Sequence, residues 1–199
     1  IVVIGGHADF GVLSGGGSSQ TNTPGWKRFD GEGPDGFPGP MTYYPSSPVK
    51  GLAARTSASV TYLDGKDVKA AAKAARGADA VIVFGTQWTG ESIDVPNLNL
   101  PGDQDALISA VAKANKKTEV VLETGGPVVM PWLNSVGAVL EAWYPGASGG
   151  EAIARVLTGE VNPSGHLPAT FPAGVDQLPR TVLDGDPKLD ENSHPHTDY

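Results

Sequence analysis

A glutamate stands in a polar loop directly after an apolar run of the sequence. The loop spans residues 89–102 and carries Glu91 near its start. The preceding run, residues 80–84, is continuously apolar and rich in valine and isoleucine, so we expect a strand covered on both faces. Loops at the C-terminal edge of a parallel sheet are where α/β proteins bind ligands. Glu91 is therefore the leading candidate for a catalytic group.

A second candidate is Ser148, which lies in a Gly-x-Ser-x-Gly pattern over residues 146–150. This pattern is typical of serine hydrolases when it joins a strand to a helix. Acidic and histidine residues follow in the chain order of a triad: Asp176, Asp184, His194 and His196. The residues after Ser148 are mostly a polar, Pro-rich tail, which offers few elements to present a triad. A tight turn of small residues explains the pattern better, and a serine esterase is our third hypothesis.

The glycine-rich segments do not form a nucleotide-binding motif. A dinucleotide fingerprint starting at Gly5 would require glycine where His7 stands, and no Lys-Ser or Lys-Thr pair follows residues 15–17. His194 and His196 resemble a pair of metal ligands, but no third ligand lies nearby in the sequence, so we expect a solvated tail. We predict neither a metal ion nor a cofactor.

The elements that would position these residues alternate along the chain. We expect strands over residues 1–4, 57–63, 80–84, 119–122, 138–142 and 167–171. Capping residues and apolar spacing predict a short helix near Pro48 and helices over residues 67–76, 103–116, 126–134 and 151–157. This order predicts an α/β fold, a three-layer α/β/α sandwich with a mostly parallel sheet. The sandwich should cover residues 1–172, and residues 173–199 should form a polar extended tail or linker.

A long excursion separates the first two expected strands. Residues 21–45 are rich in glycine and proline and carry five aromatic residues: Trp26, Phe29, Phe37, Tyr43 and Tyr44. A loop of this length in a compact domain is functional or disordered, and its aromatic side chains favour an ordered loop that packs on something.

Composition restricts the partners. The 199 residues include 14 Lys and Arg against 22 Asp and Glu, a net charge of −8 without a basic cluster. This charge argues against nucleic acid and anionic membranes as partners and suits a neutral or cationic ligand. The sequence has no cysteine, which leaves the compartment open because many periplasmic and secreted bacterial proteins also lack it. We expect a periplasmic or extracellular location, and a sequence that is part of a longer protein.

Six collinear segments resemble the second domain of family 3 glycoside hydrolases, the β-glucosidase family. They cover most of the chain and lie at residues 4–9, 15–18, 90–102, 124–128, 142–146 and 162–172. The resemblance implies an α/β sandwich that packs against an N-terminal TIM barrel and is often followed by a fibronectin-like domain. The substrate would be a β-glucoside or an oligosaccharide.

The resemblance also assigns roles to residues. In the family, the barrel supplies an aspartate nucleophile and the second domain lends the acid/base glutamate, a position on which Glu91 falls. Such an acid must hold its proton near neutral pH, which burial at an interdomain cleft would arrange. Trp88, Asp94 and Ser18 are the candidate substrate-binding residues. Trp88 would equally suit packing of the loop and Ser18 a structural turn, whereas Asp94 suits bracing of the loop better than sugar binding.

This sequence departs from the family pattern after the glutamate. The family commonly has Gly-x-Asp-Arg there, whereas Ser92 and Val95 replace the Gly and the Arg and Asp94 is retained. The nucleophile-bearing barrel is absent from these residues, so we expect the chain alone to be inactive. The alternative to catalysis is a carbohydrate-binding or assembly module.

Overall fold

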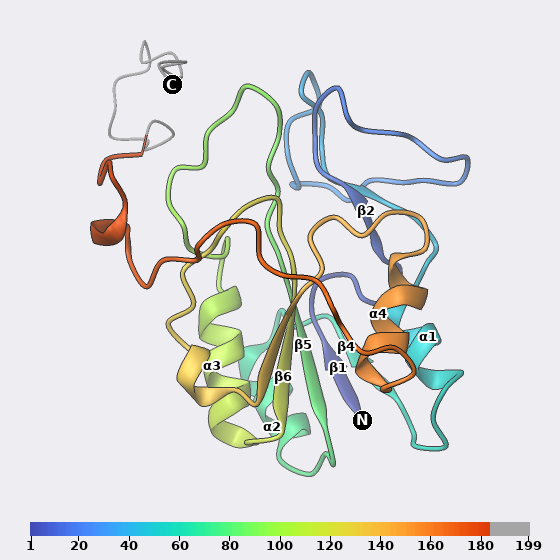
Figure 1. The fold of residues 1–199 in the computed structure, drawn as a ribbon. Coiled ribbons are helices and arrows are strands. Elements are labelled where there is room, and N and C mark those ends of the chain that lie inside the picture. Colours follow the sequence, from blue (N-terminus) through green and yellow to red (C-terminus); the bar gives the residue numbers. More distant parts are fainter. Residues whose placement is uncertain (184–199) are drawn as a thin grey trace.

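The computed structural model describes residues 1–183 and has a five-stranded parallel sheet at its centre (Figure 1). The strand order is β4-β1-β5-β6-β7, and every pair of neighbours is parallel. The strands are β1 (Val2–Ile4), β4 (Thr61–Leu63), β5 (Val81–Thr86), β6 (Thr118–Glu123) and β7 (Ala138–Glu141). The predicted parallel sheet is confirmed, and β5 continues past its expected end to Thr86.

Helices cover both faces of this sheet (Figure 1). On one face, α2 (Val68–Ala75) and α3 (Gln104–Ala114) bury Ala71, Ile108 and Val111 against side chains of the strands. On the other face, α1 (Pro48–Ala53) and α4 (Gly149–Leu157) bury Leu52 and Ile153. Because each strand contributes alternate side chains to the two cores, the predicted three-layer sandwich is confirmed.

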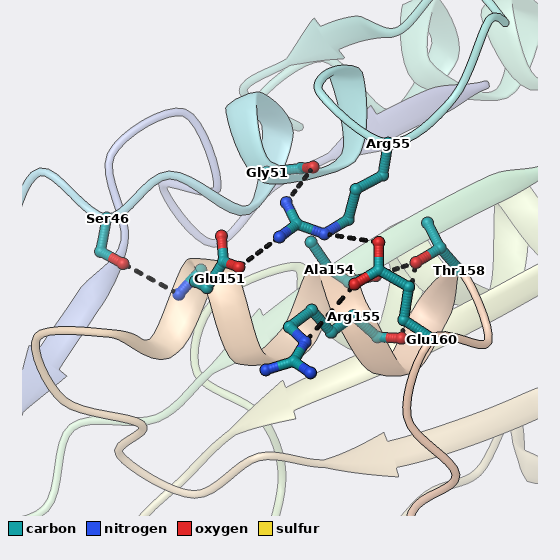
Figure 2. Close-up of polar contacts among 9 residues, drawn as sticks. Ser46, Gly51, Arg55, Glu151, Ala154, Arg155, Thr158 and Glu160 are labelled. Atoms are coloured by element: carbon teal, nitrogen blue, oxygen red, sulfur yellow. Dashed lines mark hydrogen bonds and ion pairs between the residues drawn. The ribbon is translucent and has the colours of Figure 1, made fainter.

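Ion pairs of Arg55, whose side chain is 17% exposed, connect α1 to α4 (Figure 2). The guanidinium of Arg55, which follows α1, forms an ion pair with Glu151 of α4. Its Nε lies 3.1 Å from a carboxylate oxygen of Glu160, and Nη1 donates to the carbonyl of Gly51 at 3.0 Å. The two helices are in close contact, because a Cβ on Gly51 would lie 2.8 Å from that of Ala154.

Two expected elements are wrong. Residues 126–134 do not form an α-helix, and the segment ends in a single 3-10 turn, η1 (Leu133–Ser135). Pro127 and Pro131 have no amide hydrogen, and the Val129 amide donates instead to the carbonyl of Leu98, 2.8 Å away. Residues 167–171 are not a strand, and the segment is exposed up to Phe171. Its apolar residues therefore did not mark a strand of the sheet.

The excursion is ordered, as its aromatic residues predicted. It returns to β2 (Val12–Ser14) as the short strand β3 (Thr42–Tyr43), and the two pair antiparallel in a separate small sheet. Tyr43 is fully buried there, with Phe10, Phe29, Trp88 and Tyr144 among its cluster. Strands of two or three residues are too short to show an alternating apolar pattern, so the sequence did not predict this pair.

The chain after the sandwich contains one further 3-10 turn, η2 (Val175–Gln177). The candidate residues Asp184, His194 and His196 lie outside the described residues. Among the described helices, none combines the length and the apolar character that crossing a membrane would require.

Candidate active site

The loop that carries Glu91 runs beside the glycine-rich segment that follows β2. Gly16 donates its amide to the carbonyl of Thr89 at 3.0 Å, and Glu91 donates its amide to the carbonyl of Gly16 at 3.4 Å. Gly16 and Gly90 form an isolated parallel bridge. Two segments far apart in the sequence therefore present Glu91 together, above the C-terminal end of β5.

Two glycines make this close approach possible. A Cβ on Gly17 would lie 2.6 Å from the Cβ of Glu91, and the φ of Gly17 is +112°. A Cβ on Gly15 would lie 2.5 Å from the ring of Tyr144 and 2.6 Å from the carbonyl oxygen of Thr89. Any other residue at these positions would displace the glutamate loop.

Ser18 binds the carboxylate of Glu91 directly. Its backbone amide donates to Oε2 at 2.6 Å, and the hydrogen bonds from the side chain and the amide of Ser18 lower the pKa of the exposed Glu91. A general acid needs the opposite shift. The desolvation that we expected at an interdomain cleft is not provided by this chain, and it would have to come from a surface packed over Glu91.

A cavity of about 650 Å³ opens beside Glu91. Its walls come from the segment after β2, the Glu91 loop and the ends of β6 and β7. The lining includes Ser18, Glu91, Thr124, Gly125, Trp143 and Tyr144. Small polar groups and aromatic rings around one carboxylate are a lining suited to a sugar.

Tyr144 ties the start of the glutamate loop to the end of β7. Its hydroxyl accepts from the amide of Thr89 at 2.8 Å and donates to the carbonyl of Gln87 at 2.7 Å. Burial raises the pKa of Tyr144, so the hydroxyl stays protonated and keeps both bonds.

The structure separates the three candidate substrate-binding residues. Ser18 lies in the cavity with Glu91. The indole of Trp88 instead donates to the carbonyl of Gly39 at 3.0 Å and packs over Gly33, on the side of a different cavity. Asp94 is exposed and is not among the described residues that line the Glu91 cavity. The geometry therefore favours a packing role for Trp88.

The buried Glu123 and the half-buried Glu141 stand at the C-terminal ends of the neighbouring strands β6 and β7. Burial and then the charge of Glu141 raise the pKa of Glu123 to about 8. Its carboxylate oxygens have no hydrogen-bond partner among the described residues. Burial raises the pKa of Glu141 to about 7, although Trp143 and Thr124 donate hydrogen bonds that lower it. Both carboxyls therefore hold protons well above their ordinary range.

Ser148 does not have the geometry of a nucleophile. It precedes α4 with φ −109°, whereas the serine of a nucleophile elbow sits on a strained turn. Its neighbours Gly149 and Gly150 pack against Pro145 and Ser46, which explains the run of small residues. The turn interpretation of this motif fits the structure.

The sequence reasoning singled out Glu91 and Ser18 but missed Thr124, Trp143 and Glu141. All three stand at or just past the ends of β6 and β7. Their position at the same sheet edge as Glu91 was a usable signal, because parallel strands bring their C-terminal ends together.

Comparisons with known proteins agree with one another. The model of the family described as "Glycosyl hydrolase family 3 C-terminal domain" matches residues 1–198. A β-glucosidase from Rhizobium radiobacter is 42% identical over 132 residues, which are 65% of this chain and 16% of that protein. β-Glucosidase B from Emericella nidulans is 48% identical over 110 residues, 53% of this chain and 13% of that protein. The chain thus spans less than a fifth of these relatives.

Solved structures show the same fold. A β-glucosidase from Streptomyces venezuelae in complex with D-glucose has a TM-score of 0.72 and 25% identity, over 87% of this chain and 34% of that one. A β-glucosidase from Kluyveromyces marxianus in complex with glucose has a TM-score of 0.57 and 36% identity, over 59% of this chain and 15% of that one.

Proposed function

The chain belongs to the C-terminal domain family of family 3 glycosyl hydrolases, and we propose that it lends Glu91 as general acid/base to a retaining β-glucosidase. Glu91 would protonate the glycosidic oxygen as the leaving group departs, and would then deprotonate the water that hydrolyses the glycosyl-enzyme intermediate. The position of Glu91, exposed at the mouth of a cavity at the sheet's C-terminal edge, carries this proposal.

The second carboxylate must come from elsewhere. A retaining mechanism needs two carboxyl groups about 5–5.5 Å apart. Among the described residues that line the cavity, Glu91 is the sole acid. We therefore propose that a TIM-barrel domain outside these residues supplies the nucleophile and covers Glu91, and that the chain alone is inactive. The small share of the relatives that the chain spans supports this arrangement.

A domain packed over Glu91 would also raise its pKa, as a general acid requires. The hydrogen bonds from Ser18 favour the carboxylate, which is the form that acts as base in the second step. A packed barrel would desolvate Glu91 and place a second negative charge nearby, and both changes raise its pKa. Opposing influences of this kind would let one group act first as acid and then as base.

The test uses the complete protein that carries this domain, with an aryl β-glucoside as substrate. Glu91→Ala should lower turnover most for aryl β-glucosides with poor leaving groups. Azide should restore part of the turnover, with β-glucosyl azide as the product. Glu119→Ala is the matched control, because Glu119 is an exposed glutamate of β6 that does not line the cavity. Equal activity of Glu91→Ala and the parent protein would remove Glu91 from the mechanism.

A carbohydrate-binding module is the second candidate function. The cavity's aromatic and small polar lining would suit sugar binding without catalysis. On this hypothesis Glu91→Gln changes no turnover in the complete protein. The fibronectin-like domain and the periplasmic or extracellular location remain part of the proposal, and cell fractionation tests the location.

A further inference from the structure

Trp143 has a backbone conformation that a bulky residue rarely adopts. Its φ is +53°, in the left-handed region, two residues after the end of β7. The side chain is half-buried, lines the Glu91 cavity and meets the ring of Phe171 edge to face, with centroids 6.0 Å apart. Backbone strain of this kind persists only where neighbouring groups hold it, and it is common at binding sites.

Glu141 is the group that holds Trp143. Its Oε1 accepts the hydrogen bond from the Trp143 amide at 2.8 Å. Its Oε2 lies 3.3 Å from the hydroxyl of Thr124, which also lines the cavity. One half-buried carboxyl therefore joins the two loops that follow β6 and β7, and both loops line the Glu91 cavity.

A role in core packing alone does not explain the hydrogen bonds of Glu141. A carboxyl that served only to fill the core would be replaced at no loss by an apolar side chain, and its burial here carries the cost seen in its raised pKa. The neighbouring Glu123 shows the contrast, because it is buried without a hydrogen-bond partner among the described residues. Both carboxylate oxygens of Glu141 instead accept hydrogen bonds from residues that line the cavity, Trp143 and Thr124.

We infer that Trp143 is the aromatic wall of the sugar subsite beside Glu91, and that Glu141 is a positioning residue that holds it there. The inference rests on the proposed glycosidase function. An indole offers a flat apolar surface to the C–H face of a pyranose, and Ser19 in the same cavity lining carries a hydroxyl suited to its hydroxyl groups. The ligand class is a β-linked hexose.

The experiment measures KM and kcat of the complete protein with an aryl β-glucoside. Trp143→Ala should raise KM about tenfold with little change in kcat, because it removes binding common to substrate and transition state. Trp143→Phe should recover most of the affinity. Trp143→Leu keeps apolar bulk without the aromatic face, so it should resemble Trp143→Ala even if the alanine variant folds poorly.

The same assay separates positioning from mere stability. Glu141→Ala should raise KM as Trp143→Ala does. Glu141→Gln should keep KM near that of the parent protein, because the side-chain carbonyl of glutamine still accepts the hydrogen bond from the Trp143 amide. Val139→Ala truncates a half-buried side chain earlier on β7, away from the cavity, and should leave KM unchanged.

Unchanged KM in both Trp143→Ala and Trp143→Leu would overturn the subsite. Equal effects of Glu141→Ala and Val139→Ala would overturn the positioning role. Either result leaves the acid/base proposal intact, because that proposal depends on Glu91→Ala alone, and full activity of Glu91→Ala would overturn it separately.

Discussion

Replacing Gly17 by alanine should disable the candidate site without unfolding the domain. The added Cβ would lie 2.6 Å from the Cβ of Glu91, whereas carbon atoms in contact prefer about 3.5–4.0 Å. The glutamate loop must therefore move by about 1 Å. A displacement of this size at a catalytic group costs about 10²-fold in rate, or about 2.7 kcal/mol of barrier.

Alanine at position 17 also meets backbone strain, because φ is +112° there. Strain in such a region costs about 1–3 kcal/mol. Gly159 provides the matched control, since its φ is +77° but nothing lies within 4 Å of its added Cβ. Gly159→Ala therefore carries strain without the collision with Glu91.

The assay compares kcat of the two variants in the complete protein and the thermal unfolding of the 199-residue chain. We expect both to lower Tm by several degrees, at about 2–4 °C per kcal/mol for a domain of this size. Only Gly17→Ala should lose about 100-fold in kcat. If the two variants lose activity equally, the close approach of Gly17 does not position Glu91.

Three further variants have defined expected outcomes. Ser18→Ala should raise the pKa of Glu91 toward its ordinary value in an NMR titration, because the Ser18 side chain is the main cause of the lowered value, and an unmoved pKa would contradict this. The same change should reduce the stability that Glu91 contributes above its unfolded pKa and loses as pH falls through its folded pKa. The raised pKa values of about 8 for Glu123 and about 7 for Glu141 mean that the folded chain holds protons that the unfolded chain has released. The free energy of unfolding, measured with urea, should therefore fall as the pH rises from about 5 to 8, and Glu123→Gln should make that fall less steep. An unchanged slope would show that Glu123 titrates normally. Ser92→Gly should raise Tm, since Ser92 has φ +64° and relief of the left-handed conformation is worth about 1 kcal/mol before the added chain entropy is subtracted; a lower Tm would mean that Ser92 makes contacts that offset its strain.

The family pattern and the backbone agree at Ser92. The resemblance expects glycine at this position, and the structure gives Ser92 the left-handed φ that glycine adopts most readily. A departure visible in the sequence therefore has a conformational cost that only the coordinates reveal.

Much of the fold could be predicted from local patterns. The apolar runs of β5 and β6 and the Ala-rich spacing of α2 are continuous signals that tertiary contacts do not override. The short β2–β3 pair and the missing strand at residues 167–171 could not be predicted, because pairing partners distant in sequence decide such short elements.

The site divides in the same way. The sequence by itself determined that a glutamate follows a buried strand, and its resemblance to family 3 pointed to the glycine-rich segment over residues 15–18, which was enough to single out Glu91 and Ser18. Only the tertiary structure decided that these glycines touch Glu91, that Trp143 rather than Trp88 lines its cavity, and that Glu141 holds Trp143. The reason is physical: residue type and spacing fix local conformation, but the direction of a side chain at a sheet edge depends on which loops the packed strands bring together.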